Sequence, residues 1–365
     1  MVNSKRTRIR EYTDGDEVGI LELFHTVFGH KRSKEQWKWK YIENIQGKGW
    51  ISLAERNNEI VAHYGMMHNN LNMVGQTIVA GQSSDTMVRK DQQGKGLFIK
   101  LALKDYEIAQ QSGVSAVLGF PNRNSYPGFI RRLGWHRIAT LKCYYYHLGY
   151  RKLVGRLLDK ILKRVNILYH LARYYINLLK MRKDVNGIIQ SFQMIIKNNG
   201  KTKIQASLSL PINIDDIIMD NLRYEILSVW KDSSYLKWRY EDHPYYRYVF
   251  HTLYHDGIPE AVVVCREDDE IVYICDLIIK DKDAWRAQIM VRHLILYYMR
   301  SRTQKIEFYG HDNGFFDLIF AASGFIIDPV SPLVLCGRVF NDESLLNHYY
   351  YPDSWTITYG DTDIA

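Results

Sequence analysis

The sequence has no long apolar segment and few cysteines. No run of 18 apolar residues occurs, and the first residues, MVNSKRTRIREYTDGDE, contain no apolar signal-peptide core. The four cysteines are widely spaced and form no CxxC pair; they are Cys143, Cys265, Cys275 and Cys336. We therefore expect a cytoplasmic protein whose cysteines are buried free thiols, with neither disulfides nor a zinc site.

Several catalytic and binding motifs are also missing. The chain contains no GxSxG sequence of a serine hydrolase and no GxxxxGK[ST] sequence of a nucleotide-binding P-loop. Its Lys and Arg residues are spread along the chain and form no nucleic-acid-binding module. The net charge of +8 favours acidic ligands or surfaces in general. We expect no bound metal and no specific nucleic-acid partner.

The chain does contain enough apolar material for two folded domains. Its 365 residues are 46% hydrophobic and 24% charged, a globular composition that is long for one hydrophobic core. The first half alternates helix-like and strand-like segments. We predict a helix that ends at Phe28, a second helix capped by Ser33, and a helix ending near Gln111. Strands are predicted at 7–12, 50–55, 59–67, 71–80, 82–88, 115–120 and within 135–147.

The second half repeats landmarks of the first. The sequence KWKY at 38–41 returns as KWRY at 237–240, and VLGFPNRNSYPGFIRRLGW (117–135) is echoed by FYGHDNGFFDLIFAASGF (308–325). Two landmarks in the same order at similar spacing predict tandem copies of one fold. We place the first domain at 1–150 and the second at 201–365.

Residues 151–200 interrupt this pattern. The stretch 151–185 is rich in Leu, Ile and Tyr, with Lys and Arg spread between them. Such a sequence predicts one or two basic amphipathic helices that link the domains. Alternatively, the same helices could lie on an anionic membrane surface as a peripheral contact.

A glycine turn stands before one predicted helix of the first half. Gln93-Gly94-Lys95-Gly96 follows a predicted strand and precedes an amphipathic run. Closely spaced glycines there can leave backbone amides uncovered, so that an anion binds the helix N-terminus. The alternative is a turn that only needs glycine for its backbone conformation. The second half has DKDAWRAQIMVRHLI at the corresponding place, so any anion site belongs to the first half.

These residues resemble the GNAT acetyltransferase superfamily, whose hallmark is Gln/Arg-x-x-Gly-x-Gly/Ala between a strand and a helix. Gln93, Gly94, Lys95 and Gly96 occupy the first four positions, and Phe98 the last, where a small residue is usual. The Asn-rich turn and short helix before Gly134-Trp135 are also GNAT-like. The resemblance implies an α/β fold of two tandem GNAT-like domains, each a central mixed β-sheet flanked by helices. The second domain lacks the phosphate-binding turn.

The resemblance further implies acetyl-CoA as co-substrate. Its pyrophosphate would lie on the glycine turn, near the charge of Lys95 and of Arg89 or Lys90, and its pantetheine arm along the preceding strand. The Asn residues could reach that arm, or they could simply form an Asx-turn. The implied cofactor-binding residues are Met87, Val88, Gln93, Gly94, Lys95, Gly96, Leu97, Asn122 and Asn124.

Catalysis requires a base for the amine and a proton donor for the thiolate. Many GNAT enzymes have a Tyr where this chain has Ile130, so Tyr126, one turn earlier, is the candidate acid; a packing role is the alternative. Asp85, on the strand before the glycine turn, is the candidate base, although it could be structural. His68 is a further candidate. Asp361 and Asp363 are candidates by analogy, because in some tandem GNAT proteins the C-terminus enters the first domain's site.

We therefore predict transfer of an acetyl group to a primary amine of a small molecule, such as an amino sugar or cell-surface precursor. Two alternatives remain at this point. A Fem-type aminoacyl transferase also has tandem GNAT-like folds, but the glycine turn suits a pyrophosphate better than aminoacyl-tRNA. A non-catalytic acyl-CoA-binding protein would need the turn but no catalytic Tyr.

Overall fold

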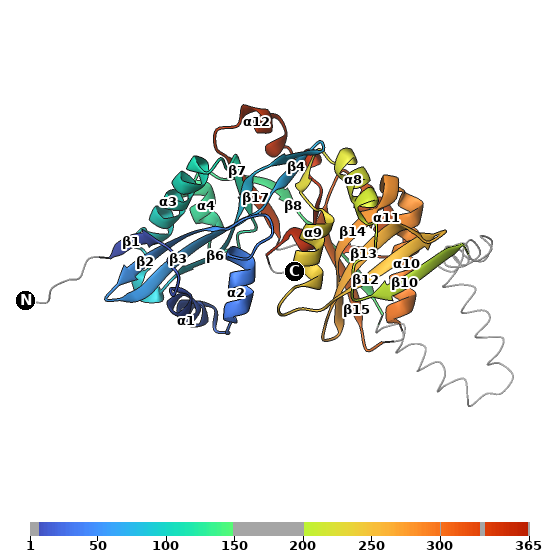
Figure 1. Cartoon of the computed structure of the whole chain (residues 1–365), viewed down its shortest axis with the longest axis horizontal. Coiled ribbons are helices and arrows are strands. Elements are labelled where there is room, and N and C mark those ends of the chain that lie inside the picture. Colours follow the sequence, from blue (N-terminus) through green and yellow to red (C-terminus); the bar gives the residue numbers. More distant parts are fainter. Residues whose placement is uncertain (1–6, 149–200, 300, 329–332, 364–365) are drawn as a thin grey trace, which may run out of the picture.

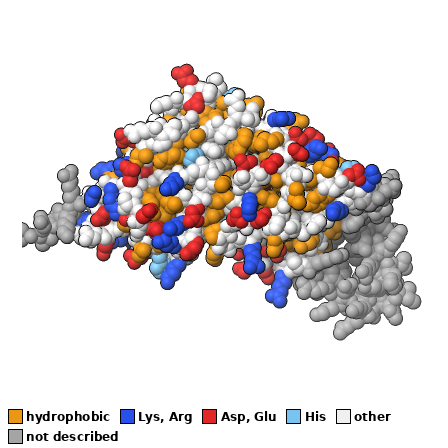
Figure 2. Space-filling model, viewed as in Figure 1, with side chains coloured by type: hydrophobic (Ala, Val, Ile, Leu, Met, Phe, Trp, Pro, Cys, Tyr) orange, Lys and Arg blue, Asp and Glu red, His pale blue; other side chains and the backbone are white. Residues whose placement is uncertain are grey.

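The computed structural model describes residues 7–148, 201–299, 301–328 and 333–363, and it contains two sheet-centred bodies side by side (Figure 1). The predicted linker at 151–200 lies outside the described residues. None of the described helices is long and apolar enough to cross a membrane. On the face that Figure 2 presents, Lys and Arg side chains are mixed with Asp and Glu and form no single basic patch.

The first body is built on a sheet with the strand order β1-β2-β3-β6-β7-β17-β8. Its strands are β1 (Arg8–Glu11), β2 (Trp50–Arg56), β3 (Glu59–His68), β6 (Ala80–Val88), β7 (Ala116–Gly119), β8 (His136–Thr140) and β17 (Val334–Val339). Its helices are α1 (Glu17–Phe28), α2 (Lys34–Tyr41), α3 (Leu97–Gln111) and α4 (Tyr126–Arg132), with the short turn η1 (Lys90–Gln92).

The second body is built on a sheet with the order β10-β12-β13-β14-β15-β9-β16, and β18 pairs with β15. Its strands are β9 (Lys142–His147), β10 (Thr202–Ser207), β12 (Tyr248–His255), β13 (Ile258–Asp268), β14 (Ile271–Ile279), β15 (Lys305–His311), β16 (Ile326–Asp328) and β18 (Ile357–Thr358). Its helical elements are α8 (Asp215–Tyr224), α9 (Ser233–Leu236), η2 (Lys237–Glu241), η3 (Lys280–Lys282), α10 (Ala284–Tyr298), α11 (Phe315–Ala322), η4 (Pro352–Ser354) and η5 (Tyr359–Asp361). The helix α12 (Glu343–Tyr349) follows β17 and packs on the first sheet, where Tyr349 Oη donates to the Val117 carbonyl at 2.8 Å (Figure 1).

Local sequence explains where several elements begin and end. Ser33 caps α2 as predicted, since its hydroxyl accepts a hydrogen bond from Gln36 N. The single strand predicted at 71–80 is wrong. Val74 and Gly75 both have positive φ and turn the chain back on itself, which gives the hairpin β4 (Leu71–Met73) and β5 (Gln76–Ile78). Asn72 Oδ1 holds this turn by accepting from Gly75 N at 2.8 Å. All four cysteines are buried free thiols, as predicted.

The two bodies exchange one strand each. β17, from the second half of the sequence, lies between β7 and β8 of the first sheet and is antiparallel to both. β9, from the first half, lies between β15 and β16 of the second sheet in the same way. The exchanged strands occupy equivalent places, so the tandem copies are related as a strand-swapped pair. The sheets therefore cross the domain boundary predicted at residue 150.

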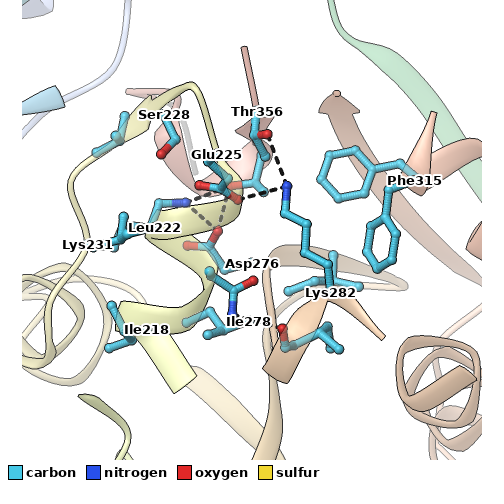
Figure 3. A pocket seen from close by; sticks show the side chains of 16 residues that line it. Ile218, Leu222, Glu225, Ser228, Lys231, Asp276, Ile278, Lys282, Phe315 and Thr356 are labelled. Carbon is cyan, nitrogen blue, oxygen red and sulfur yellow. Dashed lines mark hydrogen bonds and ion pairs between the residues drawn. The ribbon is translucent and has the colours of Figure 1, made fainter. Parts of the chain in front are cut away.

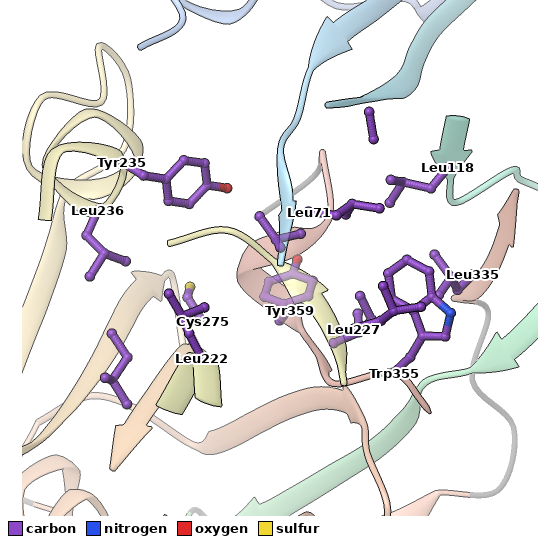
Figure 4. Packing of buried hydrophobic residues seen from close by; sticks show 14 of the residues in the cluster. Leu71, Leu118, Leu222, Leu227, Tyr235, Leu236, Cys275, Leu335, Trp355 and Tyr359 are labelled. Carbon is purple, nitrogen blue, oxygen red and sulfur yellow. The ribbon is translucent and has the colours of Figure 1, made fainter. Parts of the chain in front are cut away.

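A shared apolar core fills the junction of the bodies (Figure 4). Leu71 and Leu118 of the first body and Leu227 and Trp355 of the second belong to one buried cluster. β11 (Leu227–Val229) also pairs with β4 and extends that hairpin into a three-stranded sheet. The interface thus combines apolar burial with backbone pairing, which is typical of an obligate contact between domains.

The repeated KW[KR]Y sequences meet at this junction. Trp39 and Trp238, the equivalent residues of the two copies, stack with ring centroids 4.5 Å apart. The Trp39 indole N–H donates to the Trp238 carbonyl at 3.0 Å. Because equivalent residues of the two copies contact each other here, the pseudo-twofold axis that relates the copies passes close to the Trp39–Trp238 contact.

A substitution in the second half of the chain should therefore unfold the sheet of the first body. Gly337 lies within β17, where an added Cβ would meet Tyr349 Oη and lie 2.7 Å from the Val117 carbonyl oxygen. We expect Gly337→Val to lower the free energy of unfolding by about 2–3 kcal/mol through overpacking. Hydrogen exchange should show lost protection in β7 and β8. Ala321→Val, at an exposed site on α11, is the control and should cost less than about 1 kcal/mol. Unchanged protection of β7 and β8 in Gly337→Val would contradict the dependence of the first sheet on β17.

Candidate active site

The first sheet opens at its centre. β6 and β7 are parallel and pair only from Ala80–Gln82 to Ala116–Leu118. Beyond Gln82 and Leu118 no backbone pairing of described residues links the two strands. The remaining backbone edge of β6 up to Val88 is therefore available to a ligand that enters between the strands.

The predicted glycine turn stands at the end of this opening. Gly94 and Gly96 have φ of 75° and 74°, and an added Cβ on either would meet no atom within 4 Å. Their left-handed backbone, and not crowding, is therefore what requires glycine. Gly96 precedes α3, and within the described chain no backbone N–H from Gly94 to Ile99 has a hydrogen-bond partner. These amides and the positive end of the helix dipole form an arrangement that suits a phosphate.

A groove of about 690 Å³ connects the glycine turn to the opening between the strands. The predicted residues that line it are Val88, Gln93, Gly94, Gly96, Leu97, Asn122 and Asn124. Met87 is buried, and its backbone pairs with His63 on the other side of β6. The structure therefore brings most of the predicted cofactor-binding residues to one groove.

Two of the charges predicted to assist phosphate binding, Lys95 and Arg89, have other partners. Lys95 Nζ donates to the Asp91 carbonyl at 3.0 Å and to Gln92 Oε1 at 2.9 Å. Arg89 forms ion pairs with Glu59 and Asp91. By contrast, Arg132 lines the groove from the end of α4. Sequence reasoning missed Arg132, although it lies in the RRLGW segment (131–135), where the second copy has AASGF (321–325) and no cation.

Phe98 occupies the motif position where a small residue is usual. Its ring packs edge-on against the Phe129 ring, with centroids 5.1 Å apart. The space for the Phe98 ring exists because residue 128 is glycine, since a Cβ there would lie 2.5 Å from that ring. The groove is thus preserved because α4 has a glycine opposite the larger side chain.

Asn122 forms the Asx-turn that was the structural alternative. Its Oδ1 accepts from the backbone N–H groups of Asn124 at 3.0 Å and Ser125 at 3.1 Å. Only its amide nitrogen is left to face a ligand. Asn124 is exposed on the groove.

A second cleft of about 990 Å³ adjoins the groove. The two cavities share Phe28, Thr86, Asn122 and Ser125. Tyr126 and Asp85, the two predicted catalytic residues, both line the second cleft, as does Asp363 near the C-terminus. His30, which the sequence gave no reason to select, lines it as well. Its Nδ1 lies 3.2 Å from the Phe28 carbonyl.

The other predicted candidates lie elsewhere. His68 does not line the cleft; it stacks on Trp50 at 5.3 Å and its Nε2 contacts Asn70 Oδ1 at 3.0 Å. Asp361 is buried in the second body, where Lys231 pairs with it at 2.8 Å. Asp363 lies 3.6 Å from Lys40 at the wall of the cleft. Of the two tail residues, Asp363 reaches the cleft of the first body and Asp361 does not.

Asp85 is held by several partners. It is the extra residue of a bulge in β6, with φ of 50°, and its carboxylate binds Arg32. Lys40 Nζ lies at 3.3 Å and Tyr41 Oη donates at 2.8 Å. Burial alone would raise the pKa of Asp85, but the charges of Arg32 and Lys40 outweigh it, so the pKa lies well below its usual value. A carboxylate held in this way is a weak proton acceptor.

The second body repeats this cluster. Its carboxylate is Asp276 on β14, which binds Tyr240 Oη and Lys231 Nζ, the latter at 2.6 Å. Lys231, Tyr240 and Asp276 correspond to Arg32, Tyr41 and Asp85, since each cation directly precedes a helix-capping residue and each Tyr ends a KW[KR]Y sequence. Because the copy without a glycine turn keeps the cluster, its first role is to hold the bulged strand.

The second body's own opening is filled (Figure 3). β14 and β15 pair in parallel only up to Ile274 and Phe308, and beyond them β18 pairs with β15 at Gly310. Lys282 bridges Glu225 and Thr356 across the remaining space. The cavity there holds only about 40 Å³, room for a few waters.

Comparison with known proteins identifies the family of the first body. Residues 8–138 match the family model for an acetyltransferase (GNAT) domain. No curated protein matches the chain. The chain therefore contains a GNAT domain, the domain of N-acetyltransferases, as predicted.

Solved structures share the fold over nearly the whole chain. A conserved protein of unknown function from Enterococcus faecalis V583, described as a probable N-acyltransferase, has a TM-score of 0.63 at 11% identity, covering 93% of this chain and 74% of that one. GCN5-related N-acetyltransferases from Anabaena variabilis and Kribbella flavida have TM-scores of 0.58 and 0.59 at 8% and 12% identity. They cover 92% of this chain in each case, and 73% and 72% of their own. This likeness confirms the tandem GNAT-like fold.

Replacing Asp85 should affect stability in the same way as replacing its counterpart. Asp85→Asn leaves Arg32 without its carboxylate and Lys40 with only Asp363 at 3.6 Å, so we expect about 3 kcal/mol less free energy of unfolding. Asp276→Asn is the matched variant in the second body, and denaturant unfolding should show a loss of similar size. Loss of activity in Asp85→Asn at unchanged stability would instead identify Asp85 as a base.

The low pKa of Asp85 also sets a pH window. The folded pKa lies below the unfolded value of about 3.9, so the stability from this ion pair is complete above that pH. It is lost as the pH falls through the folded pKa. Asp85 therefore stays ionised between pH 5 and 8. A pH–rate profile of the wild type should show no inflection from Asp85 in this range.

Proposed function

We propose that this chain, which carries a GNAT domain in residues 8–138, transfers an acetyl group from acetyl-CoA to a primary amine of a small molecule. The main observation in support is that one backbone edge of β6 has no strand partner after Gln82. This edge leads to six backbone N–H groups, Gly94 to Ile99, that have no hydrogen-bond partner among the described residues. The residues present suit this co-substrate. The amides would bind the pyrophosphate, and β6 would pair with the pantetheine arm.

The acceptor amine would bind in the 990 Å³ cleft, which meets the cofactor groove at Thr86, Asn122 and Ser125. Acetyl-CoA supplies a thioester, to whose carbonyl carbon the amine nitrogen bonds while the carbon–sulfur bond breaks. Tyr126 begins α4 beside this junction, and we assign it the proton that the departing thiolate takes.

Deprotonation of the amine need not depend on Asp85. Arg32, Arg123 and Arg137 line the cleft, and nearby positive charge disfavours the protonated amine. The amine's proton can leave to solvent through the open cleft. This division gives Tyr126 a direct role and leaves Asp85 as a positioning residue for the bulge.

Binding of acetyl-CoA should depend on the glycine turn. We expect the variant Gly94→Asp/Gly96→Asp to lose at least about 100-fold in affinity by calorimetric titration, because carboxylates at the turn would repel the phosphates. Gly314→Asp is the control. Gly314 also has positive φ, 91°, with no atom within 4 Å of an added Cβ, and it precedes α11 of the second body. Equal affinity in the two variants, or no binding to the wild type, would refute the co-substrate assignment.

Tyr126 should matter for turnover and not for cofactor binding. We expect Tyr126→Phe to lower kcat by about 100-fold with unchanged affinity for acetyl-CoA, the usual size of a general-acid contribution. Release of the free thiol measures the rate. Tyr224→Phe, an exposed tyrosine on α8, is the control and should keep full activity. Tight acetyl-CoA binding with no turnover of any amine would favour a non-catalytic acyl-CoA-binding protein.

A further inference from the structure

A third cavity, of about 620 Å³, lies between the two bodies. We call it the inter-body pocket. His30, Arg32 and Asp363 line both this pocket and the 990 Å³ cleft, so the two are neighbours. Lys31, Ser33 and Gln36 form its wall on the first body, and His243, Tyr245 and Tyr246 form its wall on the second.

The pocket and the cleft are lined by positive charge. Together they present the cations Lys31, Arg32, Lys40, Arg123, Arg137 and Arg239. Among the described residues, the carboxylates that line them are Asp85 and Asp363. Both carboxylates are already engaged, because Arg32 and Lys40 bind Asp85 and Lys40 lies near Asp363. The excess charge therefore faces whatever the cavities contain.

Two of these cations, Arg239 and Lys31, differ in burial and in their hydrogen-bond partners. Arg239 is buried, and it holds the tail by donating to the carbonyls of Gly360 at 3.2 Å and Thr362 at 2.8 Å. Lys31 is exposed at the rim and makes no ion pair with a described residue. Arg and Lys side chains both form charge-assisted hydrogen bonds with carboxylates and phosphates.

His243 adds a donor without adding charge. Its Nδ1 accepts from the N–H groups of Tyr246 at 2.9 Å and Tyr245 at 3.2 Å, which leaves the proton on Nε2. Burial, with the charges of Arg239 and Arg266, lowers the pKa of His243 to about 3. The imidazole is therefore neutral at pH 7.

We propose that the inter-body pocket binds an anionic group of the acceptor, so that the substrates are amines that also carry a phosphate or a carboxylate. This inference rests on the proposed acetyl transfer, because it assumes that the amine occupies the adjoining cleft. Polycationic amines such as polyamines are disfavoured by the same charges. The second body thereby supplies part of the substrate specificity.

The first test measures anion binding without catalysis. Pyrophosphate and citrate, one phosphate and one carboxylate probe, are titrated by calorimetry into the chain saturated with CoA. The titration is repeated in Gly94→Asp/Gly96→Asp, whose turn should not take an anion. We expect binding in both cases, and whichever probe binds more tightly identifies the anionic group.

Lys31→Glu should weaken that binding by at least about tenfold. The exposed Arg223→Glu on α8 carries the same charge change outside the pocket and should stay within about twofold of the wild type. Absence of binding for both probes, or equal weakening in the two variants, would overturn the inference. A failure to bind acetyl-CoA would be seen separately, and would refute the proposed function instead.

The second test compares amines that differ by one anionic group. Glucosamine and glucosamine 6-phosphate, tyramine and tyrosine, and spermidine are assayed for thiol release from acetyl-CoA. We expect the anionic member of at least one pair to have a kcat/KM at least about tenfold higher, and this preference to fall in Lys31→Glu. Preference for spermidine would overturn the inference while supporting acetyl transfer.

Discussion

The exchange of β9 and β17 is the constraint on which the rest of the structure depends. Each strand lies inside the other body's sheet and pairs on both edges, so neither sheet is complete without the other half of the chain. The exchange also shapes the site. Leu333 and Val334, at the start of β17, line the 990 Å³ cleft of the first body. The folding of both sheets, the core at their junction and the shape of this cleft therefore depend on one another.

The same fold has two outcomes in the two bodies. Both keep a cation, a tyrosine and a carboxylate at the bulged strand, as Arg32, Tyr41 and Asp85 show for the first. Only the first has Gly94 and Gly96 before its helix; the second has Asp283, whose side chain accepts from the N–H groups of Trp285 and Arg286. A carboxylate cap satisfies the amides that a phosphate would need. In the second body the Asp283 cap occupies the helix N–H groups, and β18 fills the opening between the strands.

Features set by neighbouring residues in the sequence were predicted correctly, and features set by contacts between distant residues were missed. The glycine turn, the Ser33 cap and the KWKY repeat are local patterns, and each has the predicted place in the structure. The strand exchange was invisible, because 142–147 and 334–339 have the composition of ordinary strands in either sheet. Asp85 was predicted as the candidate base, with a structural role as the alternative. Its partners could not be predicted, because Arg32 comes from the loop before α2 and Lys40 from α2 itself, both far away in the sequence.

The tail connects the second body to the cleft of the first. β18 fills the second opening, and Arg239 and Lys231 then hold residues 360–362 by their carbonyls and by Asp361. Gln82 of the first body donates to the Asp361 carbonyl at 3.1 Å, so the tail is fixed from both sides. Asp363 is thereby held at the wall of the 990 Å³ cleft. The contacts that fill the second body's opening thus also help to shape the cleft of the first body.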